Sequence, residues 1–144
     1  MSQVDVGESV GYALKRAATA LRGAMDAELR AHELSVPQYA CLELLAYRPG
    51  LSNAELARGA FVTRQATHQL LGGLRAAGLV TGEGQGRNER LTLTAAGAHR
   101  LAGASQAVAA VQERMLAPLS APQRTRLHAD LTACVDALTS TDRA

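Results

Sequence analysis

The side chains best suited to chemistry lie on one side of a helix predicted after Thr63. With a rotation of about 100° per residue, one face collects residues that carry no large hydrophobic side chain: Arg64, Gln65, His68, Gly72 and Arg75. The opposite face is expected to be buried and collects Ala66, Leu70, Leu74 and Ala77. Arginine can form two hydrogen bonds with guanine, glutamine two with adenine, and histidine can donate to or accept from a base edge. The polar face therefore predicts a helix that enters the major groove of DNA, where the three residues nearest its N-terminus rank above Arg75 as base readers.

Hydroxyl and amide side chains near the start of this helix are suited to contact phosphates. Thr63 is expected to cap the helix, and both Thr63 and Thr67 could donate a hydroxyl hydrogen bond to a phosphate. The N-terminus of a helix also carries partial positive charge. Ser52 and Asn53, at the start of the preceding short helix, belong to the same set of candidate DNA contacts.

Three segments begin with a serine that is followed three residues later by glutamine or glutamate: Ser35 and Gln38, Ser52 and Glu55, and Ser120 and Gln123. In such a pair each side chain accepts a hydrogen bond from the other residue's backbone N–H, which favours the start of a helix. Together with the apolar periodicity, these caps predict six helices. They cover residues 8–32, the stretch from the Ser35 cap to Arg48, 54–59, the stretch from the Thr63 cap to Gly78, 95–116 and 122–138.

The spacing of the apolar residues changes after Gly78. Residues 79–81 and 90–93 read as β-strands, and the glycine-rich segment 82–88 between them predicts the tip of a hairpin. A short helix, a tight turn at residues 60–62, a second helix and this hairpin together predict a winged helix-turn-helix. The wing supplies Arg87 and Arg90, which could reach the minor groove or its phosphates. The alternative for Arg90 is that it faces the helices.

The expected fold class is mainly α with a small two- or three-stranded β-wing. The 144 residues suffice for one domain, in which about 34–100 form the winged helix-turn-helix. The helices at about 8–32 and 95–140 carry apolar residues at steps of three and four, which suits packing against other long helices. Since soluble monomers rarely expose such long apolar strips, a symmetric dimer held by these helices is expected.

Charge and composition narrow the class of protein further. Residues 48–100 hold seven basic and three acidic residues, so a local charge of +4 lies within a chain whose net charge is +2. This is where a polyanion would dock. No apolar run approaches the roughly 18 residues of a membrane span, and the first residues lack the features of a signal peptide. We therefore expect a cytoplasmic protein with no membrane partner.

Motifs for catalysis, cofactors or metals are not found. The four histidines are scattered, and neither a Gly-x-Ser-x-Gly elbow nor a P-loop occurs. We therefore expect no enzyme, no cofactor and no metal site. Cys41 and Cys134 are expected to be buried as small hydrophobic residues, with redox sensing as the alternative. Tyr12, Tyr39 and Tyr47 could line a ligand pocket or serve only in packing.

Several segments resemble motifs of the MarR family of transcriptional regulators. They begin at Leu34 (LSVPQYA), Ser52 (SNAELA), Val62 (VTRQAT), Leu74 (LRAAGLV) and Leu93 (LTAAG), and their order and spacing match over nearly the whole chain. The resemblance implies a homodimer, formed by the first and last helices, that binds a pseudo-palindromic operator, usually as a repressor. It also implies that small ligands or oxidants loosen DNA binding.

The chain departs from the family pattern in the wing. Many family wings carry an Asp-x-Arg tip, whereas this tip has no such aspartate, and Arg87 matches only the later wing arginine. The peroxide-sensing branch carries its reactive cysteine near the start of the first helix, where this chain has none. Cys41 and Cys134 therefore inherit no sensing role from the resemblance.

A second function from another class fits the same fold. A dimeric winged-helix module could bind a protein partner instead of DNA. The two differ in their response to salt, because each phosphate contact contributes a slope of roughly −0.9 to the dependence of log K on log salt concentration. A protein interface would depend on salt much less.

Overall fold

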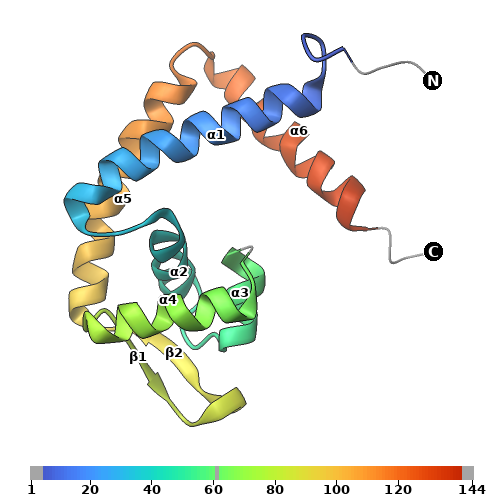
Figure 1. Cartoon of the computed structure of the whole chain (residues 1–144). Helices are drawn as coiled ribbons and strands as arrows, with labels where there is room; N and C mark the ends of the chain where they lie inside the picture. Colours follow the sequence, from blue (N-terminus) through green and yellow to red (C-terminus); the bar gives the residue numbers. More distant parts are fainter. Residues whose placement is uncertain (1–4, 61, 141–144) are drawn as a thin grey trace. The chain divides into compact units, whose positions relative to one another are not determined.

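The computed structural model describes residues 5–60 and 62–140 (Figure 1). Its helices and strands follow in the order α1 (Val10–Leu29), the 3₁₀ helix η1 (Arg30–His32), α2 (Val36–Tyr47), α3 (Asn53–Ala60), α4 (Arg64–Ala76), β1 (Val80–Glu83), the 3₁₀ helix η2 (Gly86–Asn88), β2 (Arg90–Leu93), α5 (Ala95–Leu116) and α6 (Ala121–Thr139). The chain divides into two compact units within α5, after Val111. Each unit is described by itself.

The predicted caps determine where the helices of the first unit begin. Ser35 forms a complete capping box with Gln38 at the start of α2. At α3, the Ser52 N–H donates to Glu55 Oε1 at 3.1 Å, and the Glu55 N–H donates to Ser52 Oγ at 3.2 Å. Thr63 Oγ1 accepts from the backbone N–H of Ala66 at 3.0 Å and caps α4. These caps confirm the predicted starts.

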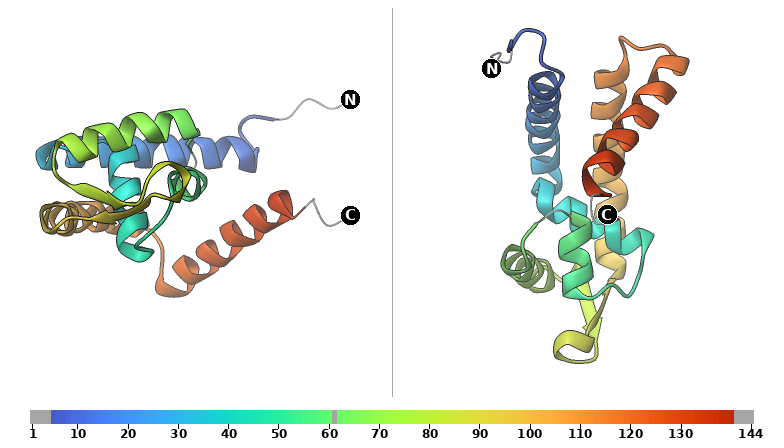
Figure 2. Two further views of the ribbon diagram at one scale, coloured as in Figure 1. Left: turned by 90° about the horizontal axis from the view of Figure 1, so that it is seen from below. Right: turned by 90° about the vertical axis from the view of Figure 1, so that its right-hand side faces the viewer.

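The wing is an antiparallel pair of strands whose register runs from Val80 opposite Leu93 to Glu83 opposite Arg90. Leu51, in the segment after α2, forms an isolated β-bridge with Leu91. The wing is therefore a two-stranded sheet, to which a third segment adds only this one residue pair. Figures 1 and 2 show the hairpin extending away from α3 and α4.

The hydrophobic core of the first unit consists mainly of leucine side chains from α1, α2, α3, α4 and the wing. The fully buried ones are Leu29, Leu42, Leu45, Leu56, Leu74, Leu79 and Leu91. The first turn of α5 joins this core at very short range, because Gly97 packs directly against the backbone of Leu79. Thr94 holds the same junction: its N–H donates to the Leu79 carbonyl at 3.0 Å, and its hydroxyl donates to the Gly78 carbonyl at 2.6 Å.

The second unit contains the end of α5 and all of α6. Ser120 and Gln123 form the predicted capping box, and Arg124 donates to both carboxylate oxygens of Glu113 at 3.2 and 3.1 Å. Apolar side chains of α6 lie on the surface: Leu127, Leu131, Val135 and Leu138. None of the helices that the structure describes is long and apolar enough to cross a membrane.

The structure corrects several details of the predicted elements. The first helix is α-helical only to Leu29 and then tightens into η1, whereas the predicted bounds of α5 are confirmed. Ala77, which was predicted to face inward, is exposed. Cys134 was predicted to be buried and is exposed on α6, whereas Cys41 is buried.

Candidate nucleic-acid interface

Helix α4 presents the polar face that the sequence predicts. Arg64, Gln65 and His68 all lie in the first half of α4, and all three side chains are exposed. The Thr63 cap fixes the start of the helix, which sets the direction in which these side chains leave it. Donors and acceptors of the kind that reads base edges are thus gathered over a short length of one helix.

The buried face of α4 differs from the prediction by about one position. Its buried residues are Thr67, Leu71 and Leu74, while Ala66 and Leu70 are only partly buried. The Thr67 hydroxyl donates to the Thr63 carbonyl at 2.9 Å and is satisfied within the helix. The prediction that Thr67 contacts a phosphate was therefore wrong, because this side chain faces the core.

A surface hollow of about 950 Å³ lies between the start of α3, the outer face of α4 and the wing. Its lining comprises Ser52, Asn53, Ala54, Arg64, Gln65, His68, Gly86, Arg87 and Glu89. The Ser52 hydroxyl oxygen accepts the capping hydrogen bond at the start of α3. Asn53 Oδ1 is buried and has no hydrogen-bond partner. The hollow thus joins most of the predicted DNA contacts into one concave surface, with basic groups supplied by both α4 and the wing.

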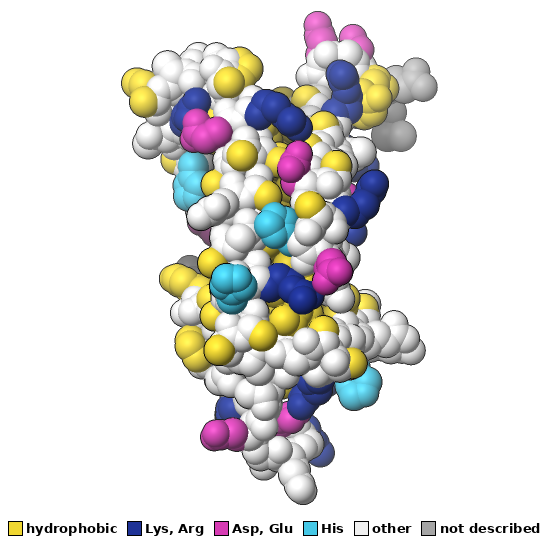
Figure 3. Space-filling model, turned by 90° about the vertical axis from the view of Figure 1, so that its left-hand side faces the viewer, with side chains coloured by type: hydrophobic (Ala, Val, Ile, Leu, Met, Phe, Trp, Pro, Cys, Tyr) yellow, Lys and Arg dark blue, Asp and Glu magenta, His cyan; other side chains and the backbone are white. Residues whose placement is uncertain are grey.

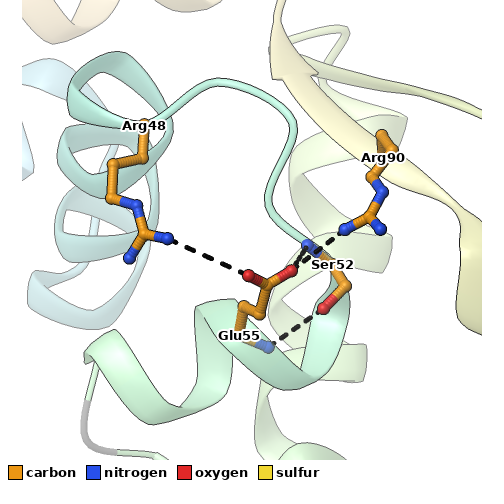
Figure 4. A network of polar contacts seen from close by, with 4 residues as sticks. All are labelled: Arg48, Ser52, Glu55 and Arg90. Carbon is orange, nitrogen blue, oxygen red and sulfur yellow. Dashed lines mark hydrogen bonds and ion pairs between the residues drawn. The ribbon is translucent and has the colours of Figure 1, made fainter.

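Glu55 anchors the start of β2 from the α3 side (Figure 4). Arg90 Nη1 donates to Glu55 Oε1 at 3.0 Å, and Arg48 Nη2 lies 4.0 Å from Oε2. The pKa of Glu55 lies below its usual value, mainly because the Ser52 backbone N–H donates to the carboxylate, with smaller contributions from the Ser52 side chain and from Arg90 and Arg48. Glu55 therefore serves both as a helix cap and as an ion-pair partner of β2.

Glu89 anchors the wing from the α4 side. Arg75, in the last turn of α4, donates from Nη2 to Glu89 Oε1. This hydrogen bond is the main reason that the pKa of the Glu89 carboxyl lies below its usual value. Arg75 and Arg90, which were both predicted to contact DNA, are therefore already engaged with carboxylates.

Arg64 and Arg87 carry the uncompensated positive charge of this surface. Among the ion pairs that residues 5–60 and 62–140 form, none involves either of them. Figure 3 shows basic and acidic side chains together with few hydrophobic ones at the lower end of the molecule, where the wing lies. Such a surface suits a hydrated, negatively charged partner better than an apolar one.

Comparison with known proteins assigns this arrangement to a family. The model of the MarR family matches residues 32–91, from the end of η1 into β2. The HTH-type transcriptional repressor Rv2887 of Mycobacterium tuberculosis is 42% identical over 118 residues, which cover 80% of this chain and 85% of the repressor. The chain belongs to the MarR family.

Solved structures of this MarR relative have the same fold. The crystal structure of Mycobacterium tuberculosis Rv2887 in complex with DNA aligns with a TM-score of 0.75 at 39% identity, covering 88% of this chain and 97% of that one. The complex of Rv2887 with salicylic acid aligns with a TM-score of 0.73 at 39% identity, covering 88% and 96% of the two chains. The predicted fold class, mainly α with a small β-wing, is confirmed.

The three tyrosines proposed for a ligand pocket lie in three different environments in this MarR chain. Tyr12 lines a hollow formed by residues of α1, and Tyr47 is 82% exposed. Tyr39 is buried, donates to Glu43 Oε2 at 2.9 Å and shares a hydrogen bond with Ser105 Oγ at 3.3 Å. Burial is the main cause of the raised pKa of Tyr39. The structure does not bring the three side chains together.

The buried cysteine is poorly suited to sense oxidants. Burial raises the pKa of the Cys41 thiol to about 11. Because the thiolate is the reactive form of cysteine, a buried thiol with a raised pKa is expected to react slowly near neutral pH. This finding argues against the alternative of redox sensing through Cys41.

Sequence reasoning missed the two carboxylates that anchor the wing. Glu55 was recognised as a capping residue, but its pairing with Arg90 spans 35 positions of the chain. Glu89 received no role, and its pairing with Arg75 spans 14 positions. The only signal in the sequence was the adjacency of opposite charges at Glu89 and Arg90, which does not name their partners.

Proposed function

We propose that the protein is a sequence-specific DNA-binding repressor that docks on duplex DNA through α4 and the wing. The observation that carries the proposal is the hollow that Arg64, Gln65 and His68 of α4 line together with Arg87 of the wing. In this arrangement α4 enters the major groove and reads base edges, while the wing contacts the adjacent backbone or minor groove. Thr63, Ser52 and Asn53 lie at the starts of α4 and α3, where they support phosphate contacts.

The proposal extends to assembly, location and control. Two chains pair through their terminal helices, so that two α4 helices enter successive major grooves about 34–36 Å apart. The exposed apolar residues of α6 support this pairing, and the whole chain then acts as one functional domain in the cytoplasm, where the DNA is. A small ligand releases the repressor; the support is that the relative Rv2887 was solved with salicylic acid. Tyr12, which lines a surface hollow, is our candidate for a ligand contact.

The response of binding to salt tests the proposed function. The operator is first located by footprinting on DNA that flanks the protein's own gene. Titration of operator and scrambled duplexes over a series of salt concentrations is expected to give a slope of about −4 to −5 in log K against log salt for about four to six phosphate contacts. Operator binding is expected to be tighter at every salt concentration. A flat salt response, or equal affinity for both duplexes, would favour the protein-binding alternative.

Replacing Arg87 with alanine is expected to weaken binding to operator and scrambled DNA by similar factors. Its side chain is exposed in η2 at the tip of the wing, where a backbone contact reads little sequence directly. The affinity is expected to fall about fivefold at moderate salt. The slope of log K against log salt should become shallower by roughly 0.9, the value of one phosphate contact. Fluorescence anisotropy on both duplexes measures it, and unchanged affinity would refute the role given to the wing.

A further inference from the structure

Two ion pairs of opposite orientation hold the wing at the start of β2, next to the tip of the hairpin. Glu89 and Arg90 are neighbours in extended backbone, and neighbouring side chains of such a segment point to opposite sides. Glu89 reaches Arg75 in the last turn of α4, and Arg90 reaches Glu55 in α3. Helices α3 and α4 are thereby connected to the wing by side-chain contacts as well as by the backbone.

A glycine on the other strand makes room for one of these pairs. A Cβ atom built on Gly82 would lie 2.8 Å from Glu89 Cδ and 2.9 Å from Glu89 Cγ, so close that the Glu89 side chain would have to move. The Glu89 side chain therefore lies across the position that a residue larger than glycine would occupy. Gly82 thus leaves the space that the carboxylate occupies, and the hydrogen bond from Arg75 holds the carboxylate there.

We propose that Glu89 is a positioning residue of the DNA interface, and that Gly82 provides the space that the Glu89 side chain occupies. The ion pair with Arg75 fixes the wing relative to α4, so that Arg87 and Arg64 face the same duplex. Glu89 also holds the Arg75 guanidinium in an ion pair, so that Arg75 supports the wing and does not contact a phosphate. The inference rests on the proposed function but concerns residues that would otherwise be expected only to repel DNA.

The proposal predicts an effect opposite to simple electrostatics. Removing a negative charge from a DNA-facing surface should normally strengthen binding. We expect Glu89→Gln to weaken operator binding by about two- to fivefold, because one exposed ion pair stabilises the anchored position of the wing by about this factor. Glu83→Gln is the matched control, because Glu83 is exposed on the same hairpin and takes part in none of the ion pairs of the described residues. It should leave affinity unchanged or raise it.

Gly82→Ala tests the same contact without changing any charge. The backbone of Gly82 does not require a positive φ, so alanine fits the strand while its Cβ displaces the Glu89 carboxylate. The operator affinity of Gly82→Ala should fall by the same two- to fivefold, about the contribution of an exposed ion pair. For Glu89→Gln, the slope of log K against log salt should stay at the wild-type value. Tighter binding by Glu89→Gln together with a slope steeper by about one contact would overturn the proposal, since Arg75 would then be a phosphate contact held back by Glu89.

Amide hydrogen exchange in the free protein separates this inference from the proposed function. If the wing is anchored as proposed, Glu89→Gln and Gly82→Ala speed exchange at β1 and β2, whereas Glu83→Gln does not. If wild-type protein binds no duplex specifically, the proposed function fails and exchange alone decides whether the wing is anchored. Unchanged exchange in both variants would refute the anchor.

Discussion

Replacing Arg64 with alanine is expected to cost about 1–3 kcal/mol in binding to the operator, the value of one two-bond contact with guanine. Arg64 lies in the first turn of α4 with its side chain exposed, and forms none of the ion pairs of the described residues. Scrambled DNA should lose less, because only the contribution of the charge disappears there. The melting temperature should barely change, since the side chain is not part of the core.

Anisotropy titrations on operator and scrambled duplexes, with a melting curve, measure this effect. Arg58→Ala is the matched control: it removes the same charge from an exposed position near the end of α3. It should not reduce the preference for the operator. Equal losses on both duplexes for Arg64→Ala would demote Arg64 to a phosphate contact, and a large drop in melting temperature would mean that it supports the fold.

Replacing Gly97 with alanine should destabilise the protein by about 3 kcal/mol, near the upper end for overpacked sites. A Cβ atom on Gly97 would overlap the carbonyl of Leu79, which is backbone and cannot rotate away. The same carbonyl accepts a hydrogen bond from Thr94, so moving α5 away would lengthen that bond as well. For a chain of this size the melting temperature should fall by about 6–12 °C.

Thermal and urea unfolding measure the effect, with Gly23→Ala as the control. Gly23 lies in α1, and a Cβ atom there would meet nothing within 4 Å. Alanine at an open helical position stabilises by about 0.5–1 kcal/mol, so the two variants should shift stability in opposite directions. A Gly97→Ala protein as stable as the wild type would show that α5 does not pack closely on the wing.

Local rules predicted the starts of the helices because each start depends on residues close in sequence. Ser35, Ser52 and Thr63 each cap a helix whose partner N–H lies three residues away. The glycine at position 78 also follows such a rule, since it adopts the left-handed conformation expected after a helix, with a φ of +74°. Elements defined within one turn of helix can be read from sequence alone.

The buried face of α4 was misplaced because a helical wheel ranks residues by polarity. Thr67 counts as polar there, yet its hydroxyl is satisfied by the Thr63 carbonyl, and the rest of the side chain packs in the core. The wing anchors were missed for a different reason. Whether Glu89 meets Arg75, or Glu55 meets Arg90, depends on where the hairpin folds back, and nothing in the local sequence encodes that position.

The apolar residues exposed on α6 have a consequence for gene dosage. In the proposed dimer they are covered only when two chains meet, so mass action links the amount of functional repressor to chain concentration. In the dilute regime the number of dimers varies with the square of the number of chains. Halving synthesis would then leave about a quarter of the DNA-binding species. Operator occupancy would respond more steeply to expression than a monomeric regulator allows, and a gene that represses itself through such a dimer would hold its own level within narrow limits.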